Sequence, residues 1–284
     1  MFNLLAVSAD AFALHVAEDF KSTFGSAHHP VAKRLESVSR LAVECIARCD
    51  ALYHNLEHTL LVTVVGIEIL RGMKLSRQLD PEEYAHMLIA CLLHDIGYVR
   101  GVLRGDGENS FVVDAGGRRI RLECGATDAS LAPYHVERSK LFACERLEPS
   151  PEIDVERIAR AIEFTRFPVP ADRVNGPETL EPRLVQAADL IGQLGDPLYL
   201  KKANALFYEF AELGINRQLG YQTPADVVER YPDFYWSRVS PHLSEAMTFL
   251  NVTSSGRRWI ANLHHNVFCA EHGFQRAGIL EDRV

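Results

Sequence analysis

DPEEYAHMLIACLLHD, residues 80–95, is the clearest helical stretch of the chain and ends on two polar residues. Asp80 can cap this helix, Pro81 suits its first turn, and Glu83 stands where a capping box requires a carboxylate. The apolar residues follow the i, i+3, i+4, i+7, i+8 spacing of one buried stripe: Tyr84, Met87, Leu88, Cys91 and Leu92. One further step along the stripe reaches Asp95, so a carboxylate is expected at the end of a buried face.

The same periodicity predicts helices on both sides of this segment. One is expected from about 55 to 71, a second from 150–151 to about 166, and a third from 178 to about 194. Residues 184–191 are apolar nearly all round, apart from Asp189, and are therefore expected to be buried on several sides. Further helices are expected in the C-terminal part, at 201–213, 237–250 and 257–271.

A different pattern lies between residues 110 and 123. Two short apolar triplets, 111–113 and 120–122, flank Gly116-Gly117, which is typical of a β-hairpin whose turn needs positive φ. The sequence therefore predicts an all-α fold with a short hairpin insertion at about 109–124. We expect a single helical domain over 1–284, with a core at about 41–200 and C-terminal helices at about 200–284.

Composition excludes several classes of protein. Of the 284 residues 47% are hydrophobic and 24% charged, as in a globular protein with a sizeable core. The net charge of −8 argues against a nucleic-acid partner or an anionic membrane surface. The longest apolar runs fall short of the ~20 residues that span a bilayer, and the 6 cysteines form no C-x-x-C pair. These features predict a cytoplasmic protein without a membrane segment, and they leave a homo-oligomer open.

Histidines and carboxylates in apolar surroundings are the most informative residues. His54 and His58 are four apart at the start of a predicted helix, and His94-Asp95 closes an apolar one. Asp189 adds a buried anion, which needs a compensating cation. Taken singly, each is more often a satisfied core residue, but a divalent metal compensates several of them together. Imidazole and carboxylate ligands suit Mn, Mg, Fe, Co or Zn and leave positions open for water.

A basic cluster after the hairpin is the second candidate feature. His135 is followed by Arg138 and Lys140, and Arg100 and Arg104 follow the His94-Asp95 pair. Phosphate recognition needs such donors, so Arg104, Arg138 and Lys140 are candidate substrate-binding residues. For His135, contact with a substrate phosphate and capping of a helix are both open. Solvated surface charge is the alternative for the arginines.

The order His58, His94-Asp95, Asp189 resembles the H…HD…D signature of HD-domain metal-dependent phosphohydrolases. In addition, residues 53–58, YHNLEH, are similar to the Y-H-N-x-x-H segment of class I cyclic nucleotide phosphodiesterases. The resemblance covers roughly residues 50 to 195. It implies an HD-domain helical bundle that binds one or two divalent ions.

Carried over position by position, the resemblance also implies roles for individual residues. His54 matches the general acid that protonates the leaving oxygen, and Asp95 is implied as a bridge between two ions. Asn55 belongs to the matching segment, and Thr165 lies in a stretch similar to one whose Thr supports the metal site. The resemblance also implies His135 as an additional metal ligand, since several HD-domain proteins place one on a helix after the HD motif. The implied ligands of the first ion are His58, His94, Asp95 and Asp189.

One position departs from the two related subfamilies. Three residues after the HD aspartate, class I phosphodiesterases have another His and HD-GYP proteins a Lys, whereas this chain has Tyr98. We therefore expect hydrolysis of a small-molecule phosphate ester, such as a nucleotide phosphomonoester or phosphodiester, without assigning a subfamily. The alternatives are a nucleotidase or nucleoside triphosphate hydrolase of the same fold, a di-iron oxygenase, and a non-catalytic nucleotide-sensing module.

Overall fold

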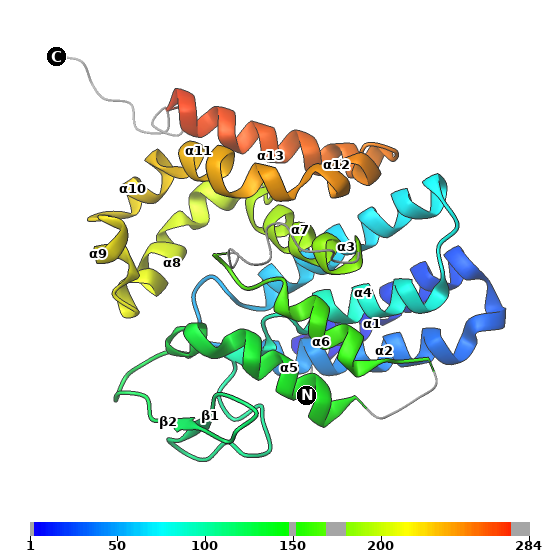
Figure 1. Ribbon diagram of the computed structural model, residues 1–284, viewed down its shortest axis with the longest axis horizontal. Coiled ribbons are helices and arrows are strands. Elements are labelled where there is room, and N and C mark those ends of the chain that lie inside the picture. The colour runs from blue at the N-terminus through cyan, green and yellow to red at the C-terminus, as the bar shows by residue number, and fades with distance from the viewer. Residues whose placement is uncertain (1–2, 148–151, 169–179, 274–284) are drawn as a thin grey trace.

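Helices make up almost all of the regular structure of this chain (Figure 1). The computed structural model describes residues 3–147, 152–168 and 180–273. The longer helices of these ranges are α1 (Leu4–Phe24), α2 (His29–Ile46), α3 (Leu56–Ser76), α4 (Pro81–Leu93), α5 (His135–Arg146), α6 (Val155–Glu163), α7 (Leu180–Leu194), α8 (Tyr199–Glu212) and α13 (Ser254–His272). The predicted all-α fold with a small hairpin is confirmed.

Shorter helical segments connect these helices. Between α8 and α13 lie α9 (Ile215–Leu219), α10 (Pro224–Glu229), α11 (Tyr231–Phe234), the π-helical segment η4 (Tyr235–Val239), the 3₁₀ turn η5 (Ser240–His242) and α12 (Ser244–Leu250). The remaining 3₁₀ turns are η1 (Ser26–His28), η2 (Ile96–Tyr98) and η3 (Asp128–Tyr134). The predicted continuous helix over 237–250 is therefore wrong in its first half, where Pro241 lacks the N–H that a helix interior requires.

Helix α4 lies at the centre of the molecule, in contact with α2, α3, α6 and α7 (Figure 1). The predicted Asp80 cap and Pro81 are confirmed, because the Asp80 side chain accepts a hydrogen bond from Glu82 N at 2.8 Å and Pro81 opens the first turn. The predicted capping box is not formed, since Glu83 pairs with Arg77. Every residue from 84 to 93 is buried, so the buried surface is wider than the one predicted stripe. The helix ends at Leu93, and His94 and Asp95 form the turn that follows.

Two other helices differ from the prediction at their ends. Helix α3 begins after Asn55 as expected but continues to Ser76, because apolar residues with helical spacing extend beyond the predicted end. Helix α6 begins at Val155, where Asp154 accepts a hydrogen bond from Arg157 N at 3.1 Å. The predicted start of α6 at 150–151 and that of α7 at 178 lie outside the described residues.

The hairpin forms where the sequence predicts it, with shorter strands. Strands β1 (Phe111–Val112) and β2 (Arg119–Ile120) are antiparallel, with Phe111 opposite Ile120. In the turn Gly117 has φ +79°, which explains a glycine at this position.

The C-terminal helices cover the part of the bundle that contains α3 and α7 (Figure 1). Asn266 on α13 donates hydrogen bonds to the carbonyls of Leu194 and Asp196, both at 2.8 Å, at the end of α7. One cluster of buried apolar side chains extends from Val16 on α1 to Val267 on α13. In the described parts of the chain, no helix has the length and apolar character needed to cross a bilayer.

Candidate metal centre

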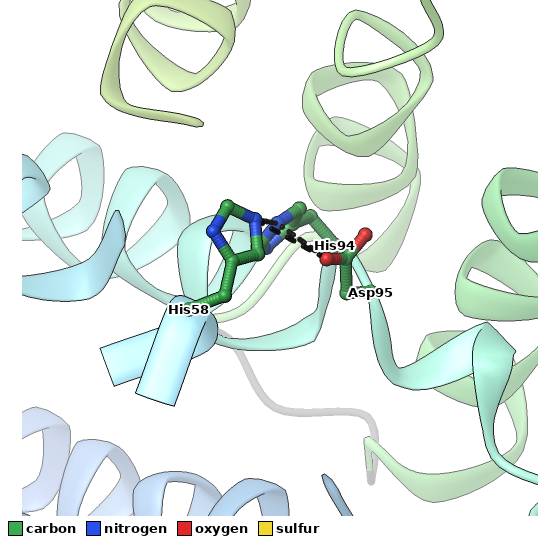
Figure 2. Close-up of side chains that lie close together, drawn as sticks. All are labelled: His58, His94 and Asp95. Carbon is green, nitrogen blue, oxygen red and sulfur yellow. Dashed lines mark hydrogen bonds and ion pairs between the residues drawn. The ribbon is translucent and has the colours of Figure 1, made fainter. Parts of the chain in front are cut away.

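Three separate helices bring His58, His94, Asp95 and Asp189 together. His58 lies in the first turn of α3, His94 and Asp95 follow the end of α4, and Asp189 lies on α7. Figure 2 shows both imidazole rings and the Asp95 carboxylate pointing toward one common point. The ligand atoms of His58, His94 and Asp95 lie within 4.8 Å of one another, and all three residues are buried.

The distances in this cluster suit ligands of one ion. His58 Nε2 lies 3.4 Å from His94 Nε2, 3.4 Å from Asp95 Oδ2 and 3.2 Å from Asp189 Oδ1. His94 Nε2 lies 3.2 Å from Asp95 Oδ2 and 3.5 Å from Asp189 Oδ1. Atoms that each bind an ion at ~2.1 Å are separated by roughly 3.0–3.5 Å in octahedral or tetrahedral geometry. The two nitrogens and two oxygens are therefore spaced as a divalent ion requires.

Hydrogen bonding around the cluster leaves the metal-facing atoms available. His94 Nδ1 donates to the Cys91 carbonyl at 2.8 Å, which directs Nε2 at the cluster. Asp95 is 3% exposed, and its Oδ2 has no hydrogen-bond partner in the described part of the chain. A buried carboxylate oxygen in this state is costly unless a cation compensates it. The donor set and this orphaned oxygen both fit a bound metal ion.

The electrostatics of the cluster also favour positive charge at its centre. Burial opposes a charge on His94, but the carboxylates of Asp95 and Asp189 outweigh burial and raise the pKa of His94 well above its usual range. Burial likewise opposes charge on the carboxylates, yet the facing histidines lower the pKa of both Asp95 and Asp189. A divalent ion would supply the positive charge for all four groups at once.

His54 is held beside the cluster by a residue from the C-terminal region. Its Nδ1 donates to Glu209 Oε2 on α8 at 2.6 Å, and Glu209 Oε1 accepts from the backbone N of Tyr53 at 2.6 Å and of His54 at 3.1 Å. Burial lowers the pKa of His54, but the charge and hydrogen bond of Glu209, with smaller effects of the cluster's aspartates, raise it to about 9. His54 therefore carries a proton at neutral pH.

His135 lies near the carboxylate oxygen of Asp95 that does not face His58 and His94. Its Nε2 is 3.8 Å from Asp95 Oδ1, and its Nδ1 donates to the Ala132 carbonyl at 2.6 Å. Burial lowers the pKa of His135, which favours the neutral ring that a metal ligand needs. The Tyr98 ring stacks between His54 and His135, with centroid distances of 4.9 and 4.7 Å. Asp95 thus faces His58 and His94 with one oxygen and His135 with the other.

Asn55 and Thr165 are occupied by local hydrogen bonds at helix ends. The Asn55 side chain caps α3 by accepting from Glu57 N at 3.0 Å. The buried Thr165 hydroxyl donates to the carbonyl of Ile162 at 2.8 Å, just beyond the end of α6. Each of these bonds therefore stabilises a helix end and does not reach the cluster.

The basic residues predicted to bind substrate are engaged elsewhere. Arg138 is 0% exposed and pairs with Asp106 through two hydrogen bonds, at 3.1 and 2.9 Å. A fully buried guanidinium cannot meet a substrate phosphate, so this prediction is wrong for Arg138. Lys140 Nζ binds Glu137 at 2.9 Å and Glu163 at 2.5 Å. Arg104 donates to the backbone of Glu145 at 2.9 Å.

Arg100, also considered as a phosphate ligand, pairs with Asp50 and Asp128. This arginine joins the loop before α3 to η3, because Asp50 and Asp128 also bind each other's backbone N–H groups at 3.1 and 2.6 Å. Its role in the structure is thus to fix the loop that leads to His54.

Two residues of this site were not found from the sequence. Glu209 was missed although a carboxylate between Phe207 and Phe210 is unusual on an apolar helix face. Ser139, whose buried hydroxyl binds the His94 carbonyl at 2.6 Å, was missed because a serine within a helix gives no signal of its own. Glu57, a carboxylate only three residues after His54, pairs with Lys202 Nζ at 2.8 Å and not with the His54 ring.

Comparisons with known proteins identify a family. No curated protein matches the chain. A family model described as Npun_R2479-like matches residues 2–273, which is nearly the whole sequence. The chain therefore belongs to the Npun_R2479-like family.

Proposed function

We propose that this protein is a metal-dependent phosphohydrolase that uses one or two divalent ions to hydrolyse a small phosphate ester. The observation that carries the proposal is the position of the His58 and His94 Nε2 atoms, each 3.2–3.5 Å from both Asp95 and Asp189. The resemblance of the same residues to the HD-domain signature supports it independently of the geometry.

The side chains divide into two ligand groups about Asp95. Asp95 Oδ2 would bind the first ion together with His58, His94 and Asp189. Asp95 Oδ1 would bind a second ion together with His135, since two ligands at ~2.1 Å from one ion lie at most about 4.2 Å apart and these are 3.8 Å apart. Mixed nitrogen and oxygen ligands suit Mn, Fe, Co, Zn or Mg.

His54 is the proposed general acid. When bound, a divalent ion lowers the pKa of water from about 15.7 toward ~7, which makes hydroxide available at neutral pH. Glu209 holds Nδ1 of His54 at 2.6 Å, so Nε2 remains as the position from which a proton can leave. His54 would donate this proton to the leaving oxygen, and Glu209 would keep the ring oriented.

The proposed substrate is a small molecule with a phosphate ester, and we expect a nucleotide. Arg138 is buried, and Arg104 and Lys140 are bound to other groups. Positive charge for a phosphate would therefore come from His54 and the bound ions. The net charge of −8 argues against a polyanionic macromolecule as the substrate.

The first experiment measures metal content and turnover together. Protein purified without chelator is analysed for metals, and is then assayed with cyclic nucleotides, mononucleotides and nucleoside triphosphates in Mn, Mg, Co or Fe. We expect His58→Ala to lose both metal and turnover, and His54→Ala to lose turnover while retaining metal. His264→Ala, on an exposed position of α13, is the matched control and should change neither.

Protein that binds none of these ions, or that keeps its metal when His58 is replaced, would exclude the cluster as a metal centre. Metal binding without hydrolysis of any of these compounds, as followed by separation of substrate and product, would exclude hydrolysis and favour the nucleotide-sensing alternative.

A second candidate function is oxidation by a di-iron centre. His135 favours it, because its contact with Asp95 makes the ligand set richer in histidine. Iron in the purified protein together with substrate-dependent oxygen consumption would support an oxygenase. Hydrolysis of a phosphate ester without oxygen consumption would exclude it.

A further inference from the structure

The turn after α4 makes close contact with α5. At Gly97 an added Cβ would lie 2.0 Å from the His135 carbonyl oxygen and 2.7 Å from Ser139 N. Glycine therefore allows the η2 backbone to lie directly against the first turns of α5. The segment that carries His94 and Asp95 is in this way brought against the helix that begins with His135.

Ser139 connects the two segments through its hydroxyl group. The hydroxyl accepts a hydrogen bond from Gly97 N at 2.9 Å and donates one to the His94 carbonyl at 2.6 Å. Ser139 is 0% exposed, so bulk water cannot replace either bond. Asp95 lies between the two backbone groups that Ser139 binds, and its backbone is therefore held relative to α5.

Arg138 extends this connection along the same turn. It donates to the carbonyls of Gly97 at 2.7 Å and Val99 at 2.9 Å, and it also binds Asp106 and the carbonyl of Val112 on β1. The backbone of residues 97–99 is thus hydrogen-bonded to Ser139 and Arg138 of α5. Through the bond to Val112, Arg138 also attaches strand β1 of the hairpin to α5.

We propose that Ser139 is a positioning residue for the second half of the metal centre, where it sets the spacing between Asp95 Oδ1 and His135 Nε2. This inference rests on the proposed metal-dependent function. Two of the first ion's four ligands, His58 on α3 and Asp189 on α7, lie outside the segments that Ser139 connects, whereas both ligands of the second ion, Asp95 and His135, lie on them. Loss of the hydroxyl should therefore weaken the second ion much more than the first.

The test is a titration of the full-length, chelator-treated protein with Mn²⁺, in which free Mn²⁺ is followed by electron paramagnetic resonance. The variants are Ser139→Ala, His135→Ala and the double variant. Ser39→Ala is the matched control, because Ser39 is also helical and 0% exposed but its hydroxyl has no hydrogen-bond partner in the described residues. Circular dichroism establishes that each variant is folded.

Wild-type protein and Ser39→Ala should bind two ions, one more tightly than the other. Ser139→Ala should weaken the second ion by about 10–100-fold, the usual effect of removing a group that orients a ligand, and leave the tighter ion nearly unchanged. The double variant should bind the second ion no more weakly than His135→Ala, because Ser139 acts through the position of His135.

Several results would overturn the inference. Ser139→Ala that binds both ions as the wild type does would overturn it, as would equal weakening of both ions or losses that add in the double variant. A single ion in the wild type would exclude the second position but leave the proposed function intact. No ion at all would overturn the proposed function as well.

Discussion

Replacement of Arg138 by Ala should strongly destabilise the protein. The Arg138 and Asp106 side chains are both 0% exposed, and their closest contact is 2.9 Å. Removal of the guanidinium would leave the Asp106 carboxylate buried without its cation. It would also take a hydrogen-bond donor from the carbonyls of Gly97, Val99 and Val112.

The magnitude follows from the burial of this pair. Breaking a buried ion pair from one side costs about 3–5 kcal/mol, since the remaining charge is uncompensated. A natural domain is stable by only about 5–15 kcal/mol, so the loss is a large part of the total. Replacing both partners, as in Arg138→Met with Asp106→Leu, removes the orphaned charge and should cost less than Arg138→Ala alone.

Urea unfolding followed by circular dichroism measures these differences. Arg118→Ala is the matched control, since Arg118 pairs with Asp114 at 2.8 Å with side chains 61% and 34% exposed. Water screens an exposed pair, so its loss should change the free energy of unfolding only slightly. A loss below about 1 kcal/mol for Arg138→Ala, far under the cost of an orphaned buried charge, would refute the reasoning from burial. A loss equal to that of Arg118→Ala would refute it as well.

Single substitutions test three further contacts: the pair of His54 with Glu209, the ion pairs of Glu163, and the close approach of Gly97 to α5. Glu209→Gln should lower the pKa of His54 and reduce turnover while metal content stays unchanged, as nuclear magnetic resonance titration and metal analysis would show; an unchanged pKa would contradict the assigned pairing. Burial opposes charge on Glu163, but hydrogen bonds from Arg166 and Lys140 lower its pKa to about 2. Its contribution to stability is therefore present above the ordinary pKa near 4.5 and is lost as the pH falls through about 2. Glu163→Gln should be less stable than wild type at pH 6 and close to it at pH 2 in denaturant titrations, whereas a constant difference would exclude the ion pairs as the cause. Gly97→Ala should destabilise the fold and weaken metal binding, because its Cβ would lie 2.0 Å from the His135 carbonyl oxygen; unchanged melting temperature and metal affinity would argue against this contact.

Local patterns in the sequence account for much of the fold. The Asp80 cap and the apolar spacing after it predict α4, and Gly116-Gly117 predicts the turn of the hairpin. These features depend on neighbouring residues, and short-range hydrogen bonds and steric limits act at that scale. The prediction for 237–250 failed because the helical periodicity of this segment hides a break at Pro241.

Residue types and their spacing are enough to show which polar groups would be costly to bury without a partner. His58, His94, Asp95 and Asp189 could be named because charged or polar groups in apolar helices need compensation, and this requirement is visible without coordinates. Their mutual distances of 3.2–3.5 Å result from the packing of α3, α4 and α7, which the spacing does not predict.

The partner that each remaining polar group takes emerges only when the helices pack. Glu209 is 155 residues from the His54 it binds, and Arg138, predicted as a substrate ligand, meets Asp106 in the core. A side chain's spacing predicts the face on which it lies but not the group that faces it from another helix. That choice depends on long-range packing, in which one pair of helices brings a carboxylate to a histidine and another encloses a guanidinium.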